Sequence, residues 1–151
     1  MTELADLYRR VEATCPAFQA RSTARALTRF YNNAFRTLSI TPEQFSLMVG
    51  IGGSDQPTVV ELAARAGVDP TTLSRSIQTL VQRDLVANIG SRGRAGKRLV
   101  LTERGERLMG EAMAAWEQAQ VQLINLLGIE AIRSSTNAMS LLAAAAQELA
   151  L

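Results

Sequence analysis

The stretch Thr58-Val-Val-Glu-Leu-Ala-Ala-Arg-Ala-Gly-Val-Asp-Pro-Thr-Thr-Leu-Ser-Arg75 decides the fold, because it carries the start and stop signals of two short helices. Thr58 and Glu61 stand three residues apart before an apolar run, which is the spacing of a capping box at a helix start. Gly67 can end that helix in the left-handed conformation, and Asp69-Pro70 then caps and starts a second helix. Two helices joined by a tight turn that contains glycine form a helix-turn-helix.

The second helix is predicted to have one apolar face and one polar face. The apolar positions recur at helical spacing and should pack inward, namely Leu73, Ile77, Leu80 and Val81. The opposite face offers hydrogen-bonding side chains of the kind that reads base edges in a DNA major groove. We expect that face to bind DNA through Thr71, Thr72, Ser74, Arg75, Gln78 and Thr79.

Two of these side chains have defined base partners. Arg75 and Gln78 lie one helical turn apart, so both can enter one groove, where arginine bridges guanine and glutamine pairs with adenine. Thr71 and Thr72 lie at the helix start, where backbone N–H groups favour phosphate. A second interpretation stays open, in which Arg75 only holds the DNA backbone and its loss weakens binding to all sequences alike.

A basic hairpin is predicted after the second helix. Residues 85–89 and 97–101 are short, apolar and β-branched enough for two strands, with a glycine- and arginine-rich turn between them. The cations of this hairpin that we expect to bind DNA are Arg92, Arg94, Lys97 and Arg98. A helix-turn-helix followed by such a hairpin predicts a winged helix-turn-helix.

Longer helices are predicted on both sides of this segment. Apolar residues recur at helical spacing over residues 3–13, from Pro16 to about Leu38, and over 103–127 and 129–149. A capping box at 41–44 predicts another helix, which ends in glycines. We assign residues 1–38 and 105–151 to dimerisation helices and residues 39–104 to the winged helix-turn-helix. The expected fold class is therefore mainly α (α+β).

The terminal helices carry more apolar surface than a small winged domain can cover. A second copy of the same helices would bury that surface in a two-fold homodimer. A dimer also suits DNA, since two recognition helices about 34–36 Å apart read half-sites one helical turn apart. The alternative is that these helices fold back on their own chain as a monomeric bundle.

Composition excludes several functional classes. The 151 residues carry a formal net charge of +2, so affinity for nucleic acid must come from local clusters of the 15 arginines and one lysine. With no histidine, one cysteine and no Gly-rich phosphate loop, we expect no enzymatic activity, no cofactor and no metal. The acidic N-terminus and the lack of a roughly 20-residue apolar run predict a cytoplasmic protein without a membrane span.

Four segments carry a family resemblance: Thr58-Val-Val-Glu-Leu-Ala63, Val68-Asp-Pro-Thr-Thr-Leu-Ser-Arg75, Leu80-Val-Gln-Arg-Asp-Leu85 and Arg98-Leu-Val-Leu-Thr-Glu-Arg-Gly105. In this order they resemble the MarR family of bacterial winged-helix transcription regulators, over nearly the whole chain. The resemblance implies a triangular homodimer that binds pseudo-palindromic operators in double-stranded DNA. It also implies release of the DNA by a ligand or an oxidant. The expected function is therefore a sequence-specific transcriptional regulator, a repressor.

The hairpin departs from the family pattern at one position. Family wings often carry an aspartate two residues before an arginine that enters the minor groove. Arg94 matches the arginine, but Arg92 stands in place of the aspartate. We expect a more cationic wing with Arg94 in a narrow A/T-rich minor groove. The alternative is a solvated hairpin that touches only phosphates, which is the preferred interpretation for Lys97 and Arg98.

Cys15 is a candidate redox sensor. With Pro16 at the first helical position, the Cys15 thiol lies at a helix cap, where the helix dipole favours a thiolate. One branch of the MarR family senses organic hydroperoxides through a lone cysteine near the N-terminus with nearby tyrosines. The resemblance extends this role to Cys15, with Tyr31 as a partner. The alternative, that Cys15 is a small buried hydrophobic residue, is slightly favoured.

A second sensing hypothesis is a pocket for a small aromatic ligand between the dimerisation helices and the winged domain. Arg21 or Arg25 would meet an anionic group, such as that of a carboxylated phenol. The lining would come from Phe18, Tyr31, Phe35, Phe45 and Met48. Phenylalanine and methionine at helical spacing more often form plain core, which is the alternative interpretation.

A function without DNA is also compatible with the predicted fold. A winged helix can act as a protein-interaction module whose arginines and glutamines meet a partner's acidic face. The four cations of the hairpin argue against this alternative, because a polyanion best offsets their mutual repulsion. A steep fall of binding with salt would indicate nucleic acid.

Overall fold

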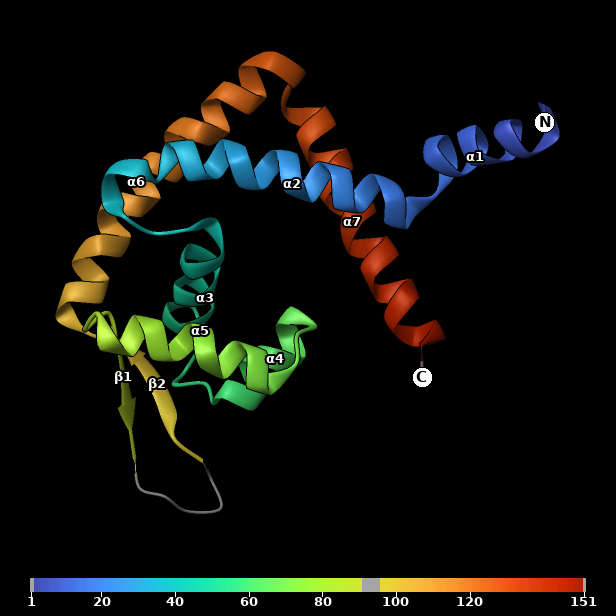
Figure 1. Cartoon of the computed structure of the whole chain (residues 1–151). Coiled ribbons are helices and arrows are strands. Elements are labelled where there is room, and N and C mark those ends of the chain that lie inside the picture. The colour runs from blue at the N-terminus through green and yellow to red at the C-terminus, as the bar shows by residue number, and fades with distance from the viewer. Residues whose placement is uncertain (1, 91–95, 151) are drawn as a thin grey trace. The chain divides into compact units, whose positions relative to one another are not determined.

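The structure is a computed structural model that describes residues 2–90 and 96–150, most of them helical (Figure 1). Two antiparallel strands, β1 (Val86–Ile89) and β2 (Arg98–Leu101), form a hairpin. The α-helices are α1 (Thr2–Thr14), α2 (Pro16–Ala34), α3 (Pro42–Gly52), α4 (Val59–Ala66), α5 (Pro70–Gln82), α6 (Glu103–Leu127) and α7 (Ile129–Leu149). The chain divides into two compact units. We call Ala34–Trp116 the winged-helix unit, and Met1–Asn33 together with Glu117–Leu151 the helical unit.

The predicted order of helices and strands is confirmed, with one correction in the second helix. The sequence predicted a helix from Pro16 to about Leu38, but α2 ends at Ala34, and a separate 3-10 helix, η1 (Arg36–Leu38), follows it. Ser39 then adopts the left-handed conformation with φ of 54°, so the backbone cannot continue as a helix.

The helix-turn-helix forms from the cap signals in its sequence, as predicted. At the start of α4, the Thr58 hydroxyl accepts a hydrogen bond from Glu61 N (3.2 Å), and the Glu61 carboxylate accepts one from Thr58 N (2.7 Å). Gly67 ends α4 in the left-handed conformation, with φ of 63°. The Asp69 carboxylate accepts from Thr72 N (2.9 Å) at the start of α5. These bonds satisfy N–H groups that every helix start leaves unpaired.

The segment before α4 lies along the hairpin. Within the hairpin, Ile89 of β1 pairs with Arg98 of β2. On the other edge of β2, Leu99 N donates to the carbonyl oxygen of Pro57 (2.9 Å), and Thr58 forms an isolated antiparallel bridge with Arg98. The base of the wing is therefore tied through the backbone to the start of α4.

The winged-helix unit has its own apolar core. The core side chains come mainly from α3, α4, α5 and the hairpin: Leu47, Met48, Ile51, Leu62, Ala63, Leu73, Ile77, Leu80, Leu85, Val86 and Leu99. Val81 packs against them from a partly buried position. Burial of each large side chain contributes about 1.5–3 kcal/mol, so the core fixes which face of α5 points inward. That face is the one predicted.

The start of α6 packs against the backbone just before β1. Thr102 Oγ1 donates to the carbonyl oxygen of Asp84 (2.6 Å) and accepts from Gly105 N (3.0 Å), so Thr102 caps α6 as predicted. A Cβ on Gly105 would lie 2.0 Å from the carbonyl oxygen of Leu85. Real atoms cannot approach so closely, so this contact requires glycine.

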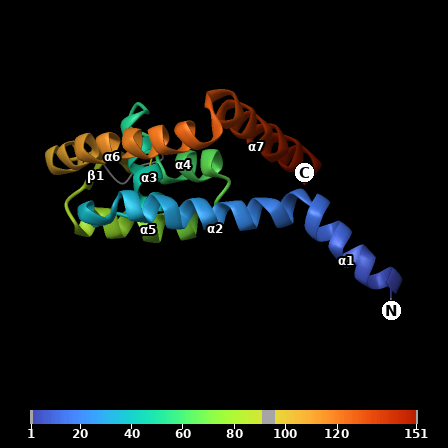
Figure 2. The same ribbon diagram turned by 90° about the horizontal axis from the view of Figure 1, so that it is seen from above.

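In the helical unit, α1 and α2 meet at an angle at Cys15 (Figures 1 and 2). Pro16 has no N–H, so the carbonyl oxygen of Glu12 lacks its usual helical partner. The Gln19 side chain supplies the missing donor, because its Nε2 donates to that oxygen (2.7 Å). Cys15 N keeps the ordinary helical bond to the carbonyl oxygen of Val11 (2.9 Å). The bend therefore retains its hydrogen bonds.

Most large apolar side chains of the helical unit are exposed in the single chain. Leu126 is 80% exposed, Leu141 72% and Leu149 87%. In the parts of this unit that the structure describes, Ala119 alone is buried. The helical unit therefore leaves apolar surface uncovered.

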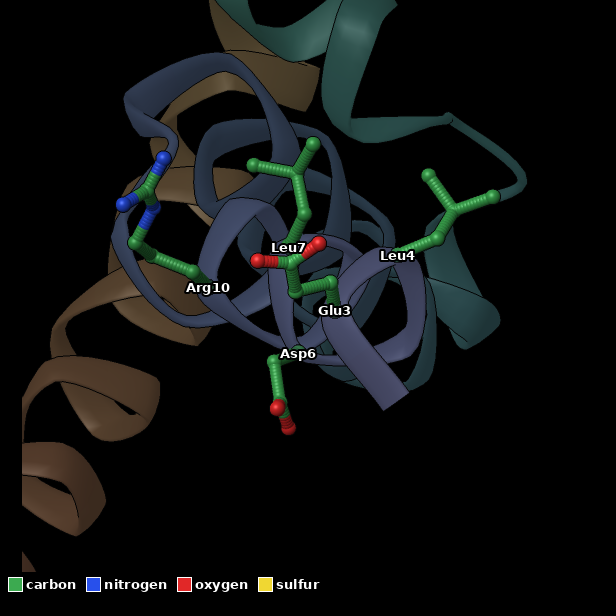
Figure 3. Close-up of a pocket in the computed structure, with 5 residues that line it drawn as sticks. All are labelled: Glu3, Leu4, Asp6, Leu7 and Arg10. Atoms are coloured by element: carbon green, nitrogen blue, oxygen red, sulfur yellow. The ribbon is translucent and has the colours of Figure 1, made fainter. Parts of the chain in front are cut away.

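The exposed surface of α1 illustrates this incomplete packing. A shallow hollow there is lined by residues of this one helix, Glu3, Leu4, Asp6, Leu7 and Arg10, whose side chains radiate from it in Figure 3. Leu4 and Leu7 remain 53% and 42% exposed. Nowhere in residues 2–90 and 96–150 is a helix both long and apolar enough to cross a membrane.

Candidate nucleic-acid interface

The polar face of α5 points to solvent, as the sequence predicted. Three side chains anchor the opposite face, because Leu73 and Ile77 are 3% exposed and Leu80 is fully buried. On the outward face, Ser74 is half-buried and the others are exposed: Thr71, Thr72, Arg75, Gln78, Thr79 and Gln82. The core thus presents a row of hydrogen-bonding side chains along one rigid helix.

The side chains of this face differ in how far they are already engaged. The Thr72 hydroxyl donates to the Asp69 carboxylate (3.3 Å), and the Thr79 hydroxyl donates to the carbonyl oxygen of Arg75 (3.3 Å). Across residues 2–90 and 96–150, no hydrogen bond or ion pair engages the side chains of Arg75 and Gln78. These two long side chains are therefore available to an incoming ligand.

A groove of about 510 Å³ runs between α5, the start of α4 and the base of the hairpin. It brings Ser74 and Gln78 of α5 together with Lys97 of the hairpin. The sequence had placed these three residues in two separate elements. The walls of the groove are mixed, polar and apolar, and its remaining lining residues are Thr58, Val59, Val60, Ile77, Val81, Gln82, Asn88 and Gly96.

Asn88 and Val60 are the lining residues whose contribution sequence reasoning missed. Asn88 is exposed in the middle of β1, where its neighbours Ala87 and Ile89 are partly buried. A lone polar residue in an apolar strand was the signal that could have identified it. Val60 is 65% exposed in the first turn of α4, and its apolar character gave no sign of a surface role.

The predicted cations of the hairpin fall into three groups. Lys97 is exposed at the edge of the groove. Arg98 is partly buried, and its Nη1 donates to the carbonyl oxygen of Gln56 (3.0 Å) and lies 3.8 Å from Glu61 Oε2. Arg92 and Arg94 lie outside the described residues. Lys97 and Arg98 are thus neighbours in sequence in very different settings.

The carboxylate of Glu61 is held in its ionised form. Its pKa is lowered from 4.5, first by the hydrogen bond from Thr58 N, then by that of the Thr58 side chain, and less by the nearby Arg98 and Arg65. The start of α4 therefore keeps a negative charge beside the hairpin at neutral pH, where it complements the positive end of the helix dipole.

The residues predicted to sense an effector are divided between the two units. In the helical unit, Cys15 and Tyr31 are half-buried, and Phe18, Arg21 and Arg25 are exposed. Tyr31 accepts a hydrogen bond from Gln120 Nε2 (2.9 Å), and burial raises the Tyr31 pKa from 10.0. Both sensing hypotheses remain predictions.

The other three residues of the predicted ligand pocket belong to the winged-helix unit. Phe35 and Met48 are fully buried there, and the rings of Phe35 and Phe45 lie 4.7 Å apart between centroids. Met48 is part of the apolar core of this unit. Met48 is thus packed as an ordinary core residue, as in the alternative interpretation that these apolar side chains form plain core.

Comparison with known proteins finds similar sequences and folds. The family model described as MarR family matches residues 38–95. The M. tuberculosis transcriptional regulator MosR, solved in complex with DNA, is 30% identical, with a TM-score of 0.74 over 87% of this chain and 98% of MosR. No curated protein matches the chain.

Two further solved structures share the fold at lower identity. A mutant MarR from E. coli, complexed with operator DNA, is 19% identical, with a TM-score of 0.77 over 88% of this chain and 96% of that one. The transcriptional repressor CouR, bound to p-coumaroyl-CoA, is 16% identical, with a TM-score of 0.79 over 88% of this chain and 94% of CouR.

Proposed function

Because the chain belongs to the MarR family of winged-helix transcriptional regulators, we propose that it is a sequence-specific DNA-binding repressor. One observation carries the proposal: the exposed face of α5 presents two long polar side chains, Arg75 and Gln78, that no described residue engages. The groove beside Gln78 continues to Lys97 at the base of the wing. A buried apolar face holds this surface rigid, so DNA binding would not have to order it first.

In the proposed complex, α5 enters a major groove of double-stranded DNA. Arg75 would bridge O6 and N7 of a guanine, and Gln78 would pair with an adenine. Lys97 would contact a phosphate at the edge of the DNA major groove. Such a contact positions the protein on the DNA without reading the base sequence. The wing would then reach the adjacent minor groove through Arg94.

We propose that the protein acts as a homodimer through its helical unit. Leu126, Leu141 and Leu149 are at least 72% exposed in the single chain, and a second copy would cover such surface. Two copies would place two α5 helices on one pseudo-palindromic operator. We place the protein in the cytoplasm, where a bacterial chromosome is accessible.

Replacing Arg75 tests the proposed function directly. Binding of the purified protein is measured on fragments of its own upstream DNA and on random DNA of equal length. Arg75→Ala should lose about 1–3 kcal/mol of binding free energy on the selected fragment and much less on random DNA. The control is Arg133→Ala, because Arg133 lies in α7 and pairs with Glu130 (2.8 Å). Equal losses on both DNAs would reduce Arg75 to a backbone contact.

Control by an effector forms part of the proposal. Under the oxidant hypothesis, peroxide releases the DNA from the unaltered protein but not from Cys15→Ser, through oxidation of the thiol to a sulfenic acid. Under the ligand hypothesis, an aromatic acid raises the melting temperature and releases DNA, and Arg21→Ala or Arg25→Ala weakens both effects. An unchanged peroxide response in Cys15→Ser, or an aromatic-acid screen without any shift, would remove the respective hypothesis.

The salt dependence of binding separates this function from a protein-interaction module. Release of counterions makes the affinity for DNA fall steeply as salt rises, with a slope that counts the neutralised phosphates. The absence of selective DNA binding at moderate salt would overturn the proposed function and favour the protein-interaction module.

A further inference from the structure

Arg98 makes contacts that set it apart from the other cations of the hairpin. Its Nη1 donates to the carbonyl oxygen of Gln56 (3.0 Å) and lies 3.8 Å from a carboxylate oxygen of Glu61. The same Glu61 oxygen accepts from Thr58 N at 2.7 Å. One guanidinium of the wing is therefore joined to the residues that cap α4.

The backbone reinforces this side-chain link. Arg98 pairs with Thr58 in an antiparallel bridge, and the next residue, Leu99, donates from its N to the carbonyl oxygen of Pro57 (2.9 Å). Gln56 adopts a left-handed conformation with φ of 48°, which is uncommon for a residue with a side chain. The hydrogen bond from Arg98 to the Gln56 carbonyl helps to hold that conformation.

We propose that Arg98 is a positioning residue, which fixes the base of the wing against the start of α4 and does not itself contact DNA. Its role is to keep Lys97 and the polar face of α5 on the two sides of one groove. The inference rests on the proposed DNA-binding function, because it concerns how the wing is aimed at the DNA.

The energetics favour a bracing role over a phosphate contact. To reach a phosphate, the Arg98 guanidinium would have to leave the Gln56 carbonyl and the Glu61 carboxylate, and both would lose a partner. Lys97 has no such commitment within the described part of the chain and is exposed at the groove. Hydrogen bonds from Thr58 and, to a smaller degree, the nearby Arg98 lower the pKa of Glu61, so a charged carboxylate lies beside the guanidinium.

The salt dependence of DNA binding tests this proposal, with Arg98→Gln and Lys97→Gln as matched variants of adjacent residues. Removal of a phosphate contact lowers the slope of log affinity against log salt by about one, so Lys97→Gln should show that decrease. Arg98→Gln should bind the selected DNA roughly threefold to thirtyfold more weakly with the slope unchanged. A slope lowered by about one in Arg98→Gln, or an unchanged affinity, would overturn the proposal.

Amide hydrogen exchange supplies a measurement that needs no DNA. The Leu99 N–H, bonded to Pro57, should exchange at least roughly tenfold faster in Arg98→Gln and in Glu61→Gln than in the unaltered chain or in Lys97→Gln. The double variant should add little to either single one, because both remove the same link. Unchanged exchange in Arg98→Gln would overturn the brace. If the unaltered protein bound no DNA selectively, the proposed function would fail, and the exchange rates would still decide whether the brace exists.

Discussion

The two units of the chain differ in whether one copy of the sequence can complete them. The winged-helix unit fully buries Met48, Leu80 and Leu99, whose side chains are each 0% exposed. The helical unit, in its described residues, buries only Ala119 and leaves Leu149 87% exposed. The first unit closes its own core, whereas the second requires another surface. The proposed DNA contact therefore belongs to one unit and the proposed dimer contact to the other. Substitutions should be able to disrupt either of them separately.

The largest effect is expected at the contact that closes the winged-helix unit, Gly105. In Gly105→Ala, the new Cβ would meet the Leu85 carbonyl oxygen at 2.0 Å, and the backbone of α6 would have to move. We expect a loss of about 3 kcal/mol or more in the free energy of unfolding, measured by urea denaturation. Gly110→Ala on the same helix is the control, because its Cβ meets nothing within 4 Å. It should stabilise the chain by about 0.5–1 kcal/mol.

The counterpart in the helical unit is a variant that separates the subunits. Leu142 is 51% exposed in α7, and Leu142→Glu would place a charge in the proposed dimer contact. Burial of one leucine contributes about 1.5–3 kcal/mol, and two-fold symmetry doubles it, so the dimer dissociation constant should rise at least about a hundredfold. Sedimentation at several concentrations measures this constant, and Ser140→Glu is the control, because Ser140 is exposed and its spacing places it on the side of the same helix opposite Leu142. A monomeric unaltered protein would favour the bundle that folds back on its own chain.

A smaller effect is expected from the cap of the recognition helix. Asp69→Ala removes the acceptor for Thr72 N (2.9 Å) at the start of α5 and should lower the free energy of unfolding by about 1 kcal/mol. Asp6→Ala removes a partner of Arg9 on the surface of α1 and should cost less than about 0.5 kcal/mol. Equal losses from the two variants would contradict the contrast between the units.

The smallest expected effect concerns pH. Because the Glu61 pKa is lowered from 4.5 in the folded chain, its stabilisation is fully present above pH 4.5 and is lost as pH falls through the lowered value. The difference in unfolding free energy between the unaltered chain and Glu61→Gln should therefore shrink on acidification. Thermal denaturation at neutral pH and at about pH 3 measures this. A difference that is independent of pH would contradict the assignment.

The recognition helix could be predicted because its signals are local. Asp69 caps it, Leu73 and Ile77 share a face by spacing alone, and the same spacing leaves Arg75 and Gln78 outward. The end of α2 was harder to place, because the apolar pattern continues to Leu38 while the α-helix already ends at Ala34 and gives way to η1. Caps and periodicity depend only on residues that are close in sequence, so they can be predicted without a structure.

The brace and the groove could not be predicted, because they depend on residues far apart in the chain. Arg98 and Gln56 are 42 positions apart, and nothing in either segment indicates the other. From sequence, Arg98 looked equivalent to Lys97, and only its contacts distinguish the two. Gly105 stood in a recognised motif, but its reason, the Leu85 carbonyl oxygen, required the fold.

The bend at Pro16 has a consequence for the choice of subunit partner. Pro16 interrupts the helix, and the Gln19 side chain supplies a donor to the carbonyl oxygen of Glu12, so both side chains support the bend between α1 and α2. A related chain with a straight helix here would aim the apolar side of α1 elsewhere and would match this chain poorly. In the proposed homodimer, a proline and a glutamine three residues apart would thus favour pairing with an identical copy over pairing with a differently shaped relative.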